Sequence, residues 1–172
     1  MPKPLKLETA VKYADQIVEI LAPYCEKIAI AGSVRRRRGI VNDIDLVVIP
    51  KDWQGLRKRC LAKCRLVLDG AEIFTVTTVN DVQLDIFTAH APGQDLAGGL
   101  ASNWGSVLLC RTGSKEHNVW LCKKAVEKGW KWSPPHGILN AHNEILASET
   151  EEDIFKRLGL EYIEPERRER NG

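Results

Sequence analysis

The chain has 172 residues, of which 44% are hydrophobic, and a formal net charge of +2. This composition excludes a disordered chain, and the length favours one large domain or two small ones that share a core. The net charge alone does not indicate a nucleic-acid-binding protein. The basic residues are clustered, however, most densely at Arg35–Arg38, and separate basic clusters favour local contacts with a polyanion. A solvated basic surface is the alternative for any one cluster.

In the first part of the chain, the pattern of apolar residues predicts a mixed α/β layer, with helices packed against one sheet. Pro23 ends the first helix, Gly32-Ser33 breaks the first strand, and Asp52 is placed to cap the second helix. The predicted helices cover residues 7–21 and 52–62, and the predicted strands cover 27–31, 43–49, 72–78 and 82–87.

After Pro92-Gly93 the pattern changes to helices and a hairpin. Thr150 is placed to cap the last helix, and the charged tail from Pro165 onward is expected to fray. We expect a boundary near residues 90–105 and therefore two parts, 1–100 and 101–172. The predicted elements are helices over 96–109 and 114–128, separated by Arg111-Thr112-Gly113, a hairpin of 137–139 with 144–146, and a short helix that begins after Thr150.

The five cysteines show no spacing typical of a secreted disulfide framework. Cys60 and Cys64 lie one helical turn apart in a segment with an amphipathic pattern, but no nearby His or further Cys completes a metal site. Reduced thiols and an intracellular, cytoplasmic location are therefore expected. No signal-type or membrane-spanning apolar run is present in the sequence, which predicts a soluble protein without membrane contact.

Carboxylates interrupt two of the predicted strands. Asp43 and Asp45 share one strand face, because successive side chains alternate, and Asp85 interrupts the alternating run 82–87. If these strands are neighbours, the three carboxylates lie together, and such a cluster is typical of sites for Mg²⁺, an oxygen-seeking cation. Exposed aspartates at strand ends are the alternative for an isolated Asp-x-Asp.

A possible phosphate site precedes the aspartates. Gly32-Ser33 ends a strand and begins a helix, so that backbone N–H groups and a hydroxyl are presented to an anion. Arg35 and Arg36 follow directly, and guanidinium groups form charge-assisted bonds to phosphate oxygens. A metal–triphosphate between the arginines and the aspartates would explain why both kinds of charge lie so close in the sequence.

Taken in this order, these motifs resemble the family X DNA polymerases, the relatives of DNA polymerase beta. Gly32-Ser33-Val34-Arg35-Arg36, Asp43-x-Asp45, Leu84-Asp85-Ile86 and Thr112-Gly113-Ser114 carry the resemblance, together with the segment 150–169, which is similar to the end of the family's thumb. The resemblance implies a nucleotidyltransferase palm (1–100) with a mixed sheet and flanking helices, followed by a small helix-plus-hairpin thumb (101–172), a minimal palm–thumb form.

The resemblance also implies roles for individual residues. Two Mg²⁺ ions, for which Mn²⁺ can substitute, would be held by Asp43, Asp45 and Asp85, the three catalytic residues. The incoming dNTP would be bound by five further residues: Gly32, Ser33, Arg36, Gly113 and Asn118.

The sequence departs from the family pattern at three places. Cys110-Arg111 stands where an aromatic pair usually contacts the sugar, Cys122 replaces a frequent arginine, and Gln83 replaces a basic residue two positions before the third aspartate. The choice between dNTP and NTP therefore stays open at this stage.

The function predicted from the sequence is template-directed DNA synthesis. The protein would add nucleotides to a primer 3′-hydroxyl in short gaps of DNA, as a DNA repair enzyme acting as a monomer. Two alternatives are weighed against it: a nucleotidyltransferase that modifies a small molecule or a protein, and a non-catalytic DNA-binding module.

Overall fold

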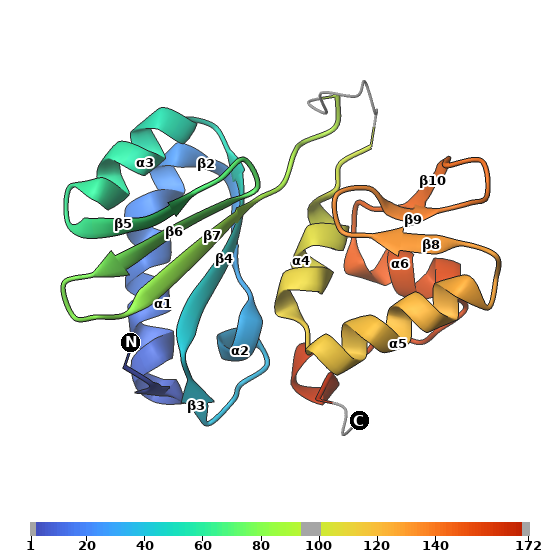
Figure 1. Ribbon diagram of the computed structural model, residues 1–172, viewed down its shortest axis with the longest axis horizontal. Helices are drawn as coiled ribbons and strands as arrows, with labels where there is room; N and C mark the ends of the chain where they lie inside the picture. Colours follow the sequence, from blue (N-terminus) through green and yellow to red (C-terminus); the bar gives the residue numbers. More distant parts are fainter. Residues whose placement is uncertain (1–2, 94–100, 170–172) are drawn as a thin grey trace. The chain divides into compact units, whose positions relative to one another are not determined.

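The computed structural model describes residues 3–93 and 101–169. The chain divides between Thr88 and Ala89 into two compact units, each with its own sheet and helices (Figure 1). The predicted fold class, mixed α/β with helices flanking a mixed sheet, is confirmed. The assignment of residues 1–100 to a palm and 101–172 to a thumb stays a prediction. In the part of the chain described, no helix combines the length and apolar character needed to cross a membrane.

The first unit is built on a five-stranded sheet of order β2-β4-β7-β6-β5, in which β4 and β7 are parallel and the other neighbours antiparallel. Two helices lie against one face of this sheet (Figure 1). In chain order the elements are β1 (Leu5–Lys6), α1 (Leu7–Leu21), a 3₁₀ turn (Ala22–Tyr24), β2 (Cys25–Ile30), α2 (Gly32–Arg35), β3 (Ile40–Val41), β4 (Asp43–Pro50), α3 (Trp53–Leu61), β5 (Cys64–Asp69), β6 (Ile73–Thr78) and β7 (Gln83–Thr88).

The core of this unit follows from alternation along the strands. Ile44, Leu46 and Val48 of β4 are fully buried and pack with residues of α1 and α3, so the intervening aspartates point to the opposite face. Asp52 caps α3 as predicted: its Oδ1 accepts a hydrogen bond from the Gly55 N–H at 2.8 Å.

One strand of this sheet was missed from the sequence. Cys60 and Cys64 do not share a helix, because α3 ends at Leu61 and Cys64 begins β5. This strand lies at an edge of the sheet, and its apolar residues 66–68 are exposed. Because three apolar residues follow one another at 66–68, the sequence lacks the alternation of apolar and polar residues that identifies a half-buried strand. All five cysteines are free thiols, as predicted.

The second unit packs helices α4, α5 and α6 against a three-stranded antiparallel sheet of order β10-β9-β8. The hairpin is found as predicted, but β8 was missed. The elements are α4 (Trp104–Thr112), α5 (Lys115–Val126), β8 (Lys131–Ser133), β9 (Gly137–Leu139), β10 (Ile145–Ala147), α6 (Glu151–Leu158) and a 3₁₀ turn (Pro165–Arg167).

The helix predicted over residues 96–109 differs at both ends. It begins at Trp104, with residues 96–100 outside the described part of the chain, and it continues through Thr112. Gly113 then ends it, because its φ of 72° lies in the left-handed region. Thr150 caps α6 as predicted, its hydroxyl accepting a hydrogen bond from the Asp153 N–H at 3.0 Å.

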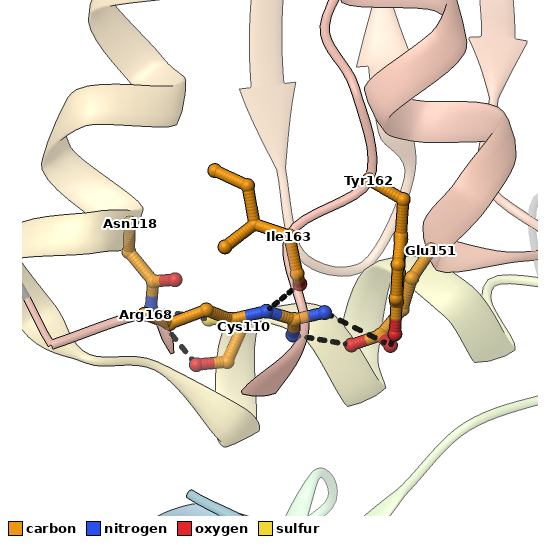
Figure 2. A network of polar contacts seen from close by, with 6 residues as sticks. All are labelled: Cys110, Asn118, Glu151, Tyr162, Ile163 and Arg168. Carbon is orange, nitrogen blue, oxygen red and sulfur yellow. Dashed lines mark hydrogen bonds and ion pairs between the residues drawn. The ribbon is translucent and has the colours of Figure 1, made fainter. Parts of the chain in front are cut away.

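The prediction that the tail frays from Pro165 is wrong for residues 165–169, and residues 170–172 lie outside the described part of the chain. Arg168 is fully buried, and its guanidinium donates to both carboxylate oxygens of Glu151, at 2.8 and 3.3 Å. Its Nε donates to the Ile163 carbonyl at 2.8 Å (Figure 2). The side chain also lies over the rings of Phe155 and Tyr162. Burial of the Arg168 charge depends on Glu151, which is 17 residues away in the sequence. The charged composition of the tail therefore wrongly predicted that this residue is exposed.

Removal of this buried arginine is expected to destabilise the second unit strongly. Arg168→Ala leaves the Glu151 carboxylate buried without its guanidinium, which costs about 3–5 kcal/mol of unfolding free energy. The double variant Arg168→Met/Glu151→Leu should recover most of the loss, since an apolar pair needs no desolvated charge. Urea unfolding measures both. Arg167→Ala, the exposed neighbour, is the control, with a change within about 0.5 kcal/mol.

Candidate active site

The connection from β2 to α2 is folded tightly against a carboxylate. Gly32 is buried with φ at +57°, and a Cβ on this residue would lie 2.6 Å from Asp45 Cγ. The Ala31 N–H also donates to the Asp45 carbonyl at 2.8 Å. Only glycine fits this close approach. The role of Gly32 in binding the nucleotide stays a prediction.

Ser33 follows directly and presents a hydroxyl with unused bonding capacity. Its Oγ is buried, and no residue in the described part of the chain forms a hydrogen bond with it. A buried hydroxyl without a partner carries a desolvation cost, which a ligand that hydrogen-bonds to the hydroxyl would remove. This is the property expected of a residue that binds a phosphate oxygen.

The two strands that carry the aspartates are neighbours, which the sequence alone left as a condition. Strands β4 and β7 are parallel neighbours, with Asp45 paired to Asp85 and Asp43 to Gln83. Residues paired in this way point to the same face of a sheet. Asp85 is buried, while Asp43 and Asp45 are partly exposed. The structure therefore brings the three carboxylates to one face at the start of two adjacent strands.

The charges of Asp85 and Arg36 both act on the Asp43 carboxyl. The pKa of Asp43 is raised above its ordinary value, first by burial and then by the charge of Asp85. Its own backbone hydrogen bond and the charge of Arg36 act in the opposite direction. Arg36 thus lies close enough to influence the carboxylates, and the aspartates repel each other as a cation site requires.

Two polar residues around Asp85 were not assigned a role from the sequence. Thr75 Oγ1 donates to Asp85 Oδ1 at 2.6 Å, and Gln83 Nε2 lies 3.2 and 3.0 Å from the two carboxylate oxygens. Thr75 lies opposite Asp85 across the β6–β7 pair. Only the pairing register of β6 with β7 gives its partner.

The expected metal site is not pre-formed as a tight cluster. Among the described residues, no group of three or more His, Cys, Asp or Glu side chains is placed to hold a metal ion. The donors nevertheless fit Mg²⁺, because all three are carboxylates on one face of the sheet. Burial is the first cause of the raised pKa of Asp43, and repulsion from Asp85, which a cation would relieve, is the second. Residence of two ions stays a prediction.

This repulsion predicts that Asp43→Asn stabilises the metal-free protein at neutral pH. A carboxyl whose pKa is raised on folding destabilises the folded state once it is ionised, so the loss grows as the pH rises above the ordinary value of 3.8. The variant should therefore need more urea to unfold at pH 7, with the difference fading below about pH 3.8. Mg²⁺ should stabilise the wild type more than the variant.

Asp15→Asn, on the exposed face of α1, is the matched control and should show neither effect. Equal stability of Asp43→Asn and wild type at all pH values would contradict the electrostatic interpretation.

The two remaining predicted site residues belong to the second unit. Gly113, with φ at 72°, connects α4 to α5, and Asn118 is the fourth residue of α5. Asn118 Nδ2 donates to the Cys110 carbonyl at 2.8 Å (Figure 2), while its Oδ1 is buried with no hydrogen-bond partner among the described residues. Cys110-Arg111, the departure from the family's aromatic pair, forms part of the last turn of α4. Each set of predicted residues is thus assembled within its own unit.

Known proteins are similar to this chain at two levels: one family model matches the second unit, and single relatives match almost the whole chain. A family model described as DNA polymerase beta thumb matches residues 107–169. The chain is 26% identical over 175 residues to the Repair DNA polymerase X of African swine fever virus (isolate Warthog/Namibia/Wart80/1980), an alignment that covers 95% of this chain and 92% of the relative.

A bacterial relative and a solved structure extend the comparison. The chain is 25% identical over 173 residues to the DNA polymerase/3′-5′ exonuclease PolX of Bacillus subtilis (strain 168), covering 98% of this chain but only 29% of that protein. The Leishmania infantum polymerase beta, in a ternary P/T complex, superposes with a TM-score of 0.76 at 16% identity, covering 98% of this chain and 77% of that one. This structural likeness shows the fold, and the predicted resemblance to the family X DNA polymerases is confirmed.

Proposed function

We propose that this relative of the family X DNA polymerases is a template-directed DNA polymerase that fills short gaps during DNA repair. The observation that carries the proposal is the pairing of Asp45 with Asp85 on parallel strands, with Asp43 on the same face and Gly32 packed against Asp45. The names of the relatives, a repair polymerase X and a polymerase beta in complexes called P/T and gap, agree with it.

The three carboxylates would hold two divalent ions, Mg²⁺ or Mn²⁺. When bound, such ions supply Lewis-acid stabilisation of the charge on the attacking and leaving oxygens. The protein's own contribution is to position these groups: Asp45 is held by its strand and by Gly32, and Asp85 by Thr75 and Gln83. Positioning and electrostatics supply most of the rate enhancement in phosphoryl transfer.

Roles in nucleotide binding are proposed for five residues. Ser33, with its unused hydroxyl, and Arg36 would bind the β- and γ-phosphates, and Gly32 would admit close approach of the backbone. Gly113 would leave room for the sugar, and Asn118 would contact the minor-groove edge of the base. The reaction is attack of the primer 3′-oxygen on the α-phosphate, with release of pyrophosphate and loss of the hydroxyl proton.

The testing experiment is extension of a labelled primer across a one-nucleotide gap, with Mg²⁺, Mn²⁺ or EDTA. Each dNTP is supplied singly, followed by the matching NTP. We expect metal-dependent addition of the template-matched dNTP. The extent of addition of the matching NTP shows whether a site with Cys110-Arg111 accepts a 2′-hydroxyl. A preparation of Asp85→Ala excludes contaminating polymerase.

Two results would overturn the proposal. Untemplated transfer to a non-DNA acceptor, with no primer extension, would favour a nucleotidyltransferase of another substrate class. A folded wild type that binds gapped DNA without adding any nucleotide, with either metal, would favour a DNA-binding module.

A further inference from the structure

The hydroxyl of Ser114 joins two distant parts of the chain. It donates to the Arg168 carbonyl at 2.9 Å and accepts a hydrogen bond from the His117 N–H at 3.3 Å. Ser114 is 5% exposed, so water does not readily replace either partner. The same oxygen therefore caps the start of α5 and connects it with the C-terminal segment.

The carbonyl that accepts this bond belongs to an immobilised residue. The Arg168 guanidinium is held by Glu151 and by the Ile163 carbonyl, and Tyr162 Oη donates to Glu151 Oε2 at 3.0 Å (Figure 2). A buried ion pair adds little net stability compared with a well-packed apolar pair. The network instead fixes the position of the backbone at Arg168. It thereby fixes the carbonyl to which the Ser114 hydroxyl donates.

The start of α5 carries the residue expected to face the nucleotide. The Asn118 N–H donates to the Ser114 carbonyl at 2.9 Å, and its side chain is turned by the bond from Nδ2 to the Cys110 carbonyl. Its buried Oδ1 has no hydrogen-bond partner among the described residues. The orientation of Asn118 therefore depends on Ser114, and Ser114 depends on Arg168.

The geometry points to Arg168 as a positioning residue for the nucleotide-binding segment Gly113–Asn118, acting through Ser114. The identity of the ligand in this inference rests on the proposed function. The coupling of Arg168 through Ser114 to Asn118 does not depend on that function. It gives the C-terminal segment a part in nucleotide binding, through the bond between the Arg168 carbonyl and Ser114.

The coupling is tested first without any nucleotide, by hydrogen exchange. Arg168→Lys keeps the charge but loses the planar fork that bonds Glu151 and Ile163 together. The amides of His117 and Asn118 should exchange at least about tenfold faster in this variant, and likewise in Ser114→Ala. The exposed neighbour gives the matched control, since Arg167→Ala should leave these amides unchanged.

The second measurement is the KM for dNTP in gap filling. We expect KM to rise at least about tenfold in Arg168→Lys, with a smaller change in kcat, because misplaced binding groups weaken the productive complex. If Arg168 acts through Ser114, the double variant Ser114→Ala/Arg168→Lys should have the KM of Ser114→Ala alone. Arg167→Ala, the change at the exposed neighbour, should retain the wild-type KM.

The two readouts separate the inference from the function on which it rests. Unchanged exchange at His117 and Asn118 in a folded Arg168→Lys would overturn the inference, as would multiplicative KM effects in the double variant. If Arg168→Lys does not fold, Tyr162→Phe, which removes one bond to Glu151, replaces it with the same expected direction. If the amides of His117 and Asn118 exchange faster in Arg168→Lys but the wild type extends no primer, the proposed polymerase function is wrong and the coupling is still supported.

Discussion

Asp85→Asn is expected to reduce gap filling by about 10²–10³-fold, while the protein stays folded. The carboxylate charge is lost where negative charge is required to hold divalent ions, and removal of one such electrostatic group costs about 10²–10³ in rate. The shape of the side chain is kept, and its amide oxygen can still accept the hydrogen bond from Thr75. Single-turnover extension across a one-nucleotide gap, with Mg²⁺, measures the loss.

A carboxylate on the same sheet provides the control for Asp85→Asn. Asp69 lies on β5, separated from β7 by β6, and forms an exposed ion pair with Arg57. Asp69→Asn should leave the extension rate within about twofold of wild type, since a surface pair contributes about 0–1 kcal/mol. Comparable losses in both variants would show that the effect is general, and a fully active Asp85→Asn would remove Asp85 from the active site.

Gly32→Ala is expected to reduce both stability and activity. An alanine at φ +57° is strained, and its Cβ would overlap the Asp45 carboxylate, so that either the turn or the aspartate must move. Strain and overpacking of this kind cost about 2–5 kcal/mol together. Displacement of Asp45 by about 1 Å would reduce extension by about 10²-fold or more, even in the molecules that remain folded.

Urea unfolding and gap filling, measured on the same preparation, separate these two effects. Gly39→Ala is the matched control: this glycine is exposed, and nothing lies within 4 Å of the position its Cβ would take. It should unfold and extend as the wild type does. A Gly32→Ala protein with normal stability would contradict the close packing of the turn on Asp45.

The sequence by itself determined those features that depend on near neighbours along the chain. The helix over Leu7–Leu21 was predicted with its observed bounds, because amphipathic spacing and Pro23 are both local signals. The caps by Asp52 and Thr150 were predicted for the same reason, since a cap bonds an N–H three residues away. Alternation alone placed the buried and polar residues of β4 on opposite faces.

Only the tertiary structure decided which strands are neighbours and which polar groups meet. Asp45 faces Asp85 because β4 and β7 pair in parallel, and Thr75 reaches Asp85 because of the register of β6, neither of which short-range patterns encode. Arg168 was predicted on a frayed tail because its charge favours water when it is alone. It is buried because Glu151, 17 residues away, neutralises it in a site that desolvates both. Local propensity acts over a few residues, whereas burial and pairing energies depend on contacts that form only when the chain has folded.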